Sequence, residues 1–218
     1  MRSRHVDEFN HDELAAGYDE DVLDETDPIR AGYADCLRWT VERAEISPAS
    51  TVVDLGSGTG NTSALVPAAG CLICVDISTK MMEFARPKLA HLSRVEYVQA
   101  DLLEFFEEPR EFDRLVSTYA VHHLTADEKA VLLERLAQSL AADGIAVFGD
   151  LMFADRAEAV AMAEKYADWP DVYESFQEEH YWYLDSTAAM AEAAGFAMTE
   201  TRRFSDLSWG IRLERAGA

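Results

Sequence analysis

Apolar and polar positions alternate along the chain in a regular succession of short apolar runs and longer amphipathic stretches. The short runs are rich in β-branched residues and predict strands, whereas the amphipathic stretches predict helices. The strands are expected at residues 51–54, 71–76, 95–100, 112–118 and 144–151, and the helices at residues 60–67, 78–90, 126–141 and 155–168. Pro87 should kink or end the second helix. Such alternation is typical of a parallel sheet that is covered by helices on both faces.

The N-terminal part of the chain follows a helical pattern. Asp27-Pro28 places a proline at a first helical position, and the stretch "ISPAS" at residues 46–50 ends the pattern. Between these points the apolar side chains recur at helical spacing, at Ile29, Tyr33, Leu37, Val41 and Ala44.

The C-terminal part predicts a helix at residues 186–194 that Gly195 ends, followed by two strand-like runs at 196–204 and 208–214. These runs are joined closely enough to pair in an antiparallel hairpin. The sequence therefore predicts one α/β domain with a mixed sheet. With 218 residues, of which 49% are hydrophobic, the chain is long enough to bury a full core.

The charge is strongly one-sided. The formal net charge is −22 and the pI is about 4.5, which disfavours binding to nucleic acid. A salt-rich cytoplasm and simple solubility are both consistent with this surface. No apolar run approaches the roughly 20 residues that cross a membrane, and the N-terminal stretch turns acidic where a signal peptide turns apolar, so we expect a cytoplasmic protein. Cys71 and Cys74 should point to opposite faces of one strand, which favours free buried thiols.

The stretch "TVVDLGSGTG", residues 51–60, carries the clearest chemical signal. A strand that leads into a glycine-rich turn is typical of nucleotide binding. A dinucleotide fold prefers a glycine where Asn61 stands. Asp76 and Asp101 end the next two strands, where one carboxylate can accept hydrogen bonds from a ribose and the other from an adenine amine. Because basic residues are absent nearby, these acids suit a pyrophosphate poorly.

Taken together, these motifs resemble those of the class I S-adenosylmethionine-dependent methyltransferases. "VVDLGSGTG" is similar to their first motif, "VDIS" to their ribose-binding segment, "QADLLEF" to their adenine-side segment, and "FDRLVSTYAVHHL" to their fourth strand and active-site loop. The N-terminal "FNHDELAAGYDE" is similar to a segment that closes over the cofactor. The resemblance covers nearly the whole chain and implies a Rossmann-like, seven-stranded mixed sheet with helices on both faces, an antiparallel last strand and an N-terminal helical cap.

The resemblance also implies how the domain is divided and which residues bind the cofactor S-adenosylmethionine. Residues 1–48 form the helical cap, 49–151 the cofactor-binding core, 152–185 an insertion that covers the substrate, and 186–218 the terminal helix and hairpin. The implied cofactor-binding residues are Tyr18, Asp54, Gly56, Gly58, Gly60, Asp76, Ile77, Met81, Asp101, Leu102 and Ser117. For Met81, packing in the core is an equal alternative.

Three residues are candidates for a catalytic role: His122, His123 and Tyr18. A histidine after the fourth strand can accept a proton from a nucleophile, although a structural role for at least one of the pair is the stronger interpretation. The aromatic stretch at residues 166–183 either covers the substrate or packs against itself. Its interleaved acids favour a neutral or cationic acceptor.

The sequence narrows the chemistry further by what it lacks. It has no Asn/Asp-Pro-Pro-aromatic motif, no Pro-Cys nucleophile and no metal-ligand spacing, so we expect no metal and a methyl acceptor that is an O, N or S nucleophile of a small metabolite. Two alternatives stay open: a cofactor-binding protein without transfer activity, and an RNA-modifying enzyme that acts with a basic partner. A homodimer is also compatible with the sequence.

Overall fold

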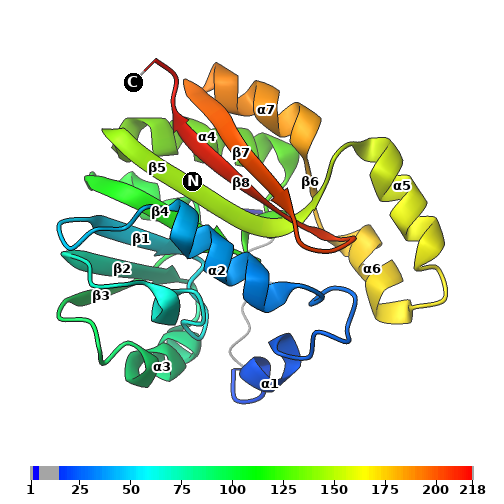
Figure 1. Ribbon diagram of the computed structural model, residues 1–218, viewed down its shortest axis with the longest axis horizontal. Helices are drawn as coiled ribbons and strands as arrows, with labels where there is room; N and C mark the ends of the chain where they lie inside the picture. The colour runs from blue at the N-terminus through cyan, green and yellow to red at the C-terminus, as the bar shows by residue number, and fades with distance from the viewer. Residues whose placement is uncertain (1, 5–14, 218) are drawn as a thin grey trace.

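The structure is a computed structural model that describes residues 2–4 and 15–217. A central sheet has helices on both faces (Figure 1). The strands are β1 Thr51–Leu55, β2 Cys71–Asp76, β3 Val95–Gln99, β4 Phe112–Thr118, β5 Leu140–Phe153, β6 Trp182–Tyr183, β7 Phe196–Arg203 and β8 Ser208–Arg215. The α-helices are α1 Tyr18–Val22, α2 Tyr33–Arg43, α3 Thr79–Lys88, α4 Ala126–Ser139, α5 Arg156–Lys165, α6 Pro170–Glu178 and α7 Leu184–Ala193.

The strand order is β3-β2-β1-β4-β5-β8-β7, and β6 pairs with β5 outside this path. Strands β1 to β5 pair in parallel, whereas β8 runs antiparallel to both β5 and β7. The predicted mixed sheet with an antiparallel last strand is therefore confirmed. The sequence did not predict β6, a two-residue strand that pairs with Met152 and Phe153 at the end of β5.

The two faces of the sheet have separate cores. On one face, side chains of β1, β4 and β5 pack with α4 and α7, and on the other they pack with α2 and α3. Cys71 belongs to the first core and Cys74 to the second, and both are buried free thiols, as their spacing predicts. A third cluster joins the N-terminal helices to α5, α6 and the end of β5. In Figure 1, α5 and α6 stand beside this end of β5.

Two predicted helices differ from the structure. Residues 60–67 form only a 3-10 turn, η2 Ser63–Leu65, because Val66 precedes Pro67 and takes an extended conformation. The helix that was expected to begin at Pro28 begins instead at Tyr33, after Gly32 in a left-handed conformation. Pro87 lies one residue before the end of α3, as predicted.

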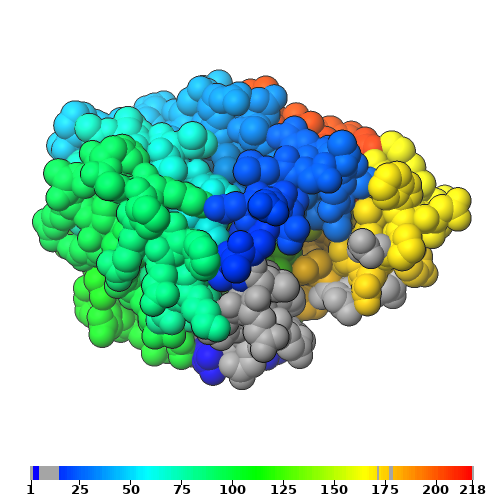
Figure 2. Space-filling view, turned by 90° about the horizontal axis from the view of Figure 1, so that it is seen from below, coloured from blue at the N-terminus to red at the C-terminus, as the bar shows by residue number. Residues whose placement is uncertain are grey.

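The described N-terminal residues, 2–4 and those of α1, lie at the edge of the sheet where the parallel strands end. Figure 2 shows these residues, in blue, between the green region around α3 and the yellow region of α5 and α6. Residues 5–14, which include the first half of the segment predicted to close over the cofactor, are outside the described residues. The described part of that segment, residues 15–20, leads into α1.

Candidate active site

A cavity lies at the carboxyl ends of β1 to β4, and the N-terminal residues cover part of it. It contains about 900 Å³ of empty space, part of which is continuous with solvent. Of the residues that the sequence assigns to the cofactor, the cavity is lined by Tyr18, Gly56, Gly58, Asp76, Ile77, Met81, Asp101 and Leu102.

The glycine-rich turn after β1 forms the floor of this cavity. Gly56 and Ser57 both donate backbone hydrogen bonds to the carbonyl of Val75, which holds the turn against β2. A Cβ atom at Gly56 would stand 2.4 Å from the Cβ of Ala120, so packing excludes a side chain there. Gly58 is different: its φ is +50°, and a Cβ atom there would meet nothing within 4 Å. The space above Gly58 is therefore open for a ligand to approach the backbone.

Asp76 stands at the end of β2 with both carboxylate oxygens directed by backbone groups. Its Oδ2 accepts a hydrogen bond from Gly58 N at 2.7 Å, and its Oδ1 accepts one from Ser78 N at 2.8 Å. Ser78 in turn caps α3 by accepting from Met81 N. The glycine turn and the acid that the sequence assigns to a ribose are thus one connected unit.

Asp101 follows β3 and is almost completely buried. Its Oδ1 accepts hydrogen bonds from the backbone of Leu103 and Glu104. The N-terminal Ser3 also binds this carboxylate, through its N at 3.1 Å from Oδ1 and its Oγ at 2.5 Å from Oδ2. Ser3 is a lining residue that the sequence did not indicate.

Three predicted cofactor residues do not line the cavity: Asp54, Gly60 and Ser117. Asp54 is fully buried under the turn, where its Oδ2 accepts a hydrogen bond from Ser63 Oγ at 2.5 Å. Burial raises the pKa of Asp54 to about 7. Ser117 donates its hydroxyl to the carbonyl of Leu55. Asp54 and Ser117 therefore make hydrogen bonds on the side of the turn that faces away from the cavity. A direct contact of Asp54, Gly60 or Ser117 with the cofactor stays a prediction.

A polar network ties helix α1 to the glycine turn. Asp19 accepts hydrogen bonds from Thr59 Oγ1 at 2.6 Å and Asn61 Nδ2 at 3.1 Å, and it pairs with Lys88 of α3 at 2.6 Å. These hydrogen bonds lower the pKa of Asp19 despite its partial burial. The network brings the neighbouring Tyr18 to the cavity wall. Neither Thr59 nor Asn61 was predicted as a site residue, although Thr59 belongs to the glycine-rich motif and Asn61 directly follows it.

Aromatic rings form another part of the wall. Tyr18 is partly buried, and desolvation raises the pKa of its phenol, while Arg30 acts in the opposite direction. Tyr33 and Tyr119 also line the cavity, with ring centroids 5.2 Å apart. Tyr119 has a φ of 48°, which is uncommon for a bulky residue and typical of functional loops. The sequence did not single out Tyr33 or Tyr119 as site residues.

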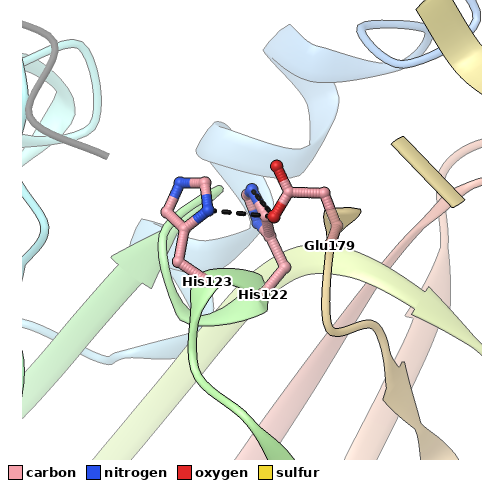
Figure 3. Close-up of side chains that lie close together, drawn as sticks. All are labelled: His122, His123 and Glu179. Atoms are coloured by element: carbon pink, nitrogen blue, oxygen red, sulfur yellow. Dashed lines mark hydrogen bonds and ion pairs between the residues drawn. The ribbon is translucent and has the colours of Figure 1, made fainter. Parts of the chain in front are cut away.

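The two histidines that follow β4 have different surroundings. His123 lines the cavity, and its Nδ1 lies 3.0 Å from Glu179 Oε2. His122 is buried and not among the lining residues; its Nδ1 lies 2.5 Å from Oδ1 of Asp150 on β5. Burial, together with the neighbouring His122, lowers the pKa of His123 to about 4. Figure 3 shows both imidazoles directed toward Glu179.

The insertion over residues 152–185 contributes chiefly to the third hydrophobic cluster. Phe176 and Tyr181 pack against Phe153 at the end of β5, with ring centroids 5.7 and 5.0 Å away. Trp169 and Tyr173 are exposed. The cavity lining includes no residue of the insertion among those that the structure describes. Its covering role stays a prediction, and its contact with the site runs through Glu179.

No helix within the described part of the chain is long and apolar enough to cross a membrane.

Comparisons with known proteins identify methyltransferases as relatives of this chain. A methyltransferase-domain family matches residues 52–144. An uncharacterized methyltransferase of Anoxybacillus flavithermus is 33% identical over 195 residues, which are 88% of this chain and 87% of the relative. One of Bacillus cereus is 34% identical over 203 residues, with 89% and 92% covered.

Solved structures show the same fold. Magnesium protoporphyrin IX methyltransferase of Synechocystis, with bound S-adenosylhomocysteine, has a TM-score of 0.68 at 20% identity and covers 97% of this chain and 98% of its own. The N-methyltransferase NodS of Bradyrhizobium japonicum has a TM-score of 0.63 at 14% identity, with 85% and 97% covered.

Proposed function

The chain belongs to the class I S-adenosylmethionine-dependent methyltransferases, and we propose that it methylates an oxygen, nitrogen or sulfur nucleophile of a small metabolite. The single observation that carries this proposal is the unit formed by Gly58 and Asp76. An open glycine and a fixed carboxylate face one cavity at the ends of adjacent parallel strands, which is where ligands bind in such sheets.

The residues present fit the cofactor. Gly58 leaves the space that a Cβ would fill, Asp76 offers its carboxylate to the ribose hydroxyls, and Asp101 lies at the adjacent strand end for the adenine amine. Ile77, Met81 and Leu102 add apolar surface to the same cavity. When bound, the cofactor supplies a methyl group on a sulfonium centre and a good leaving group.

The chain itself aligns the reactants and excludes water. Tyr18, Tyr33 and Tyr119 build a wall at the ends of β1 and β4, and the bonds from Asp19 to the glycine turn hold α1 over the cavity. Closing a site in this way favours a displacement between two positioned reactants. The catalytic roles proposed for Tyr18 and His123 rest on this position at the wall.

The charge around the site supports a neutral or cationic acceptor. Asp150 and Glu179 lie beside the two histidines, and the net charge of the chain is −22, so an anionic acceptor would meet repulsion. The three free, buried cysteines fit a reducing compartment, which supports a cytosolic place for the reaction.

Calorimetry and a transfer assay test this proposal. We expect S-adenosylhomocysteine to bind the purified chain, and Asp76→Ala to weaken that binding by roughly 1.5–3 kcal/mol, because a hydrogen bond to a charged group is lost. Folding of the variant is checked by circular dichroism. Unchanged affinity in a folded variant would refute the ribose assignment.

The acceptor is sought by incubating the chain with methyl-labelled cofactor and panels of small thiols, amines, phenols and carboxylic acids. Transfer to one of these classes supports the proposal. Binding without transfer across the panel would favour a non-catalytic binding protein, and label found only in RNA, in the presence of a basic partner, would favour RNA modification.

A further inference from the structure

Three potential metal ligands converge beside the cavity. Within the described residues, His122, His123 and Glu179 place their ligand atoms within 4.8 Å of one another. Glu179 Oε2 lies 3.0 Å from His123 Nδ1 and 3.8 Å from His122 Nε2, and Figure 3 shows both rings turned toward this carboxylate. Ligand atoms bound to one zinc ion at about 2.1 Å stand roughly 3–3.5 Å apart. The two separations from Glu179 lie at the lower end of this range and just above it, so a small movement of the side chains brings the three ligand atoms to one ion.

A second carboxylate orients the buried member of this cluster. The Nδ1 atom of His122 lies 2.5 Å from Asp150 Oδ1, and the other oxygen of Asp150 accepts hydrogen bonds from the backbone of Val121 and His122. A proton on Nδ1 leaves the lone pair on Nε2, which is the atom that faces Glu179. This carboxylate–histidine arrangement is the usual support of a metal-bound imidazole.

Glu179 is fixed in place although it comes from a distant part of the chain. The next residue, His180, donates its N to the carbonyl of His122 at 2.9 Å, and Lys129 Nζ donates to the carbonyl of His180. Strand β6 then pairs with β5 two residues further on. These backbone contacts hold the carboxylate against the histidines without using its oxygens, which remain directed at the imidazoles.

The charges of the cluster favour an added cation. Asp150 and Glu179 place two carboxylates in a largely buried region, and Lys129 supplies one buried ammonium group. Among the described residues, the ion-pair partners of Glu179 are the two imidazoles. Buried charge is costly unless it is compensated, and a divalent ion at this point would compensate it.

We propose that His122, His123 and Glu179 bind a divalent transition-metal ion of the zinc type, and that the ion binds the thiol or hydroxyl group of the methyl acceptor. Two histidines and a carboxylate are ligands that zinc and its neighbours accept, and three protein ligands leave a further position open, as in catalytic sites. His123 lines the cavity, so this open position faces the space proposed for the reactants. The acceptor half of the proposal rests on the proposed function.

The ion would lower the pKa of the acceptor and present it as an anion. In the transfer, a bond forms between the acceptor sulfur or oxygen and the methyl carbon while the bond from that carbon to the sulfonium sulfur breaks. The electron pair of the broken bond stays on the cofactor sulfur, and the acceptor proton passes to solvent. No redox partner is needed.

Metal binding is tested first, without reference to activity. The full-length chain is dialysed against a chelator and titrated with Zn²⁺ by calorimetry and with Co²⁺ by visible absorption. We expect one ion per chain. Glu179→Gln, which keeps the side-chain shape, and His123→Ala should each weaken binding at least about tenfold. The matched control is His91→Ala, an exposed histidine outside the cluster, which should bind as the wild type does.

Binding of S-adenosylhomocysteine, measured on the same samples, separates the two proposals and reports on folding. Loss of metal binding with retained S-adenosylhomocysteine affinity in Glu179→Gln supports the site. Equal Co²⁺ binding by the wild type and Glu179→Gln, or none by either, overturns it while leaving the proposed function untouched. Transfer to a thiol or hydroxyl acceptor should stop after chelation and return with Zn²⁺; full transfer by metal-free chain would overturn the role of the ion.

Discussion

The cavity has two halves: a cofactor half, formed by the glycine turn, Asp76 and Asp101, and an acceptor half beside His122 and His123. One completely buried carboxylate lies beneath each half, and the surroundings shift the pKa values of these two carboxylates in opposite directions. Asp54 lies under the glycine turn, where Ser63 is its hydrogen-bond partner, and burial raises its pKa to about 7. Asp150 lies beneath the histidines. Burial alone would raise its pKa as well, but the interaction with neighbouring His122 and the hydrogen bond from Leu151 outweigh burial, and the pKa of Asp150 is lowered. The pKa of one buried acid is therefore raised, which favours its neutral form, and the pKa of the other is lowered, which favours its carboxylate.

The difference fits the ligands that we propose for the two halves, the cofactor at the glycine turn and the acceptor at the histidines. In the cofactor half, Asp76 and Asp101 are held by backbone N–H groups that lie within a few residues or on the neighbouring turn. In the acceptor half, His122 and His123 depend on Asp150 and Glu179, which come from later parts of the chain. Backbone N–H groups are present whatever the side chain, so the first arrangement suits a cofactor that does not change. The second depends on side chains, so substituting one of them can change which acceptor binds.

The largest effect is expected on stability, for a substitution of Asp150 beneath the acceptor half. Asp150→Asn should lower the free energy of unfolding by about 3 kcal/mol, because it replaces a buried carboxylate whose oxygens bind the imidazole partner His122 and accept from the backbone of Val121 and Leu151. Urea unfolding measures this, and Asp54→Asn, at an equally buried acid without such a partner, is the matched control. A loss below about 1 kcal/mol for Asp150→Asn would mean that the two buried acids are equivalent and that the comparison is wrong.

The second-largest effect is expected on the affinity for S-adenosylhomocysteine, in the cofactor half. Gly58→Val should weaken S-adenosylhomocysteine binding at least about a hundredfold, or roughly 3 kcal/mol, because the new side chain would occupy the ligand space and resist a φ of +50°. Gly195→Val is the control: its φ is +88° and its Cβ also meets nothing within 4 Å, but Gly195 ends α7 away from the cavity. If both variants bind normally, the turn is not the cofactor cradle.

The contrast explains which parts of the site the sequence could predict. Gly58, Asp76 and Asp101 lie at or just beyond the ends of β1, β2 and β3, so strand prediction alone brings them to one edge of the sheet. Glu179 could not be placed, because its position depends on the contacts of His180 with His122 and of Lys129 with His180, which no local pattern encodes.

The fold shows the same limit. The strands have their own apolar patterns and were predicted closely, whereas the 3-10 turn at Ser63–Leu65 and the late start of α2 at Tyr33 depend on Pro67 and on the left-handed Gly32. The network of Asp19 with Thr59 and Asn61 also needs the tertiary structure, because it joins α1 to the turn after β1.

A smaller effect concerns pH and again separates the two buried acids. Because the pKa of Asp54 is about 7 in the folded chain and near 4 when unfolded, the unfolded chain loses this proton first. The stability that protonated Asp54 contributes is complete below pH 4 and decreases as pH rises toward 7. Relative to Asp54→Asn, the wild type should lose about 1–2 kcal/mol between pH 6 and 8. Urea unfolding at several pH values measures the difference, and parallel curves for the two chains would contradict the assignment.

The smallest effect tests whether the N-terminal residues compete with the cofactor. The hydroxyl of Ser3 occupies Asp101 Oδ2 at 2.5 Å, while Oδ1 already accepts from Leu103 and from Ser3 N. An adenine amine that binds this carboxylate must therefore share or displace the hydroxyl of Ser3.

Ser3→Ala should tighten S-adenosylhomocysteine binding by roughly two- to tenfold, the range that a net hydrogen-bond contribution of 0.5–1.5 kcal/mol allows. Calorimetry measures the affinity, and Thr26→Ala, which removes an exposed hydroxyl bound to Asp24 at 2.5 Å, is the matched control and should change nothing. Weaker binding by Ser3→Ala would reverse the interpretation, because Ser3 would then help to hold Asp101 in its binding position. In that case the N-terminal residues belong to the cofactor half as a supporting element and not as a competitor.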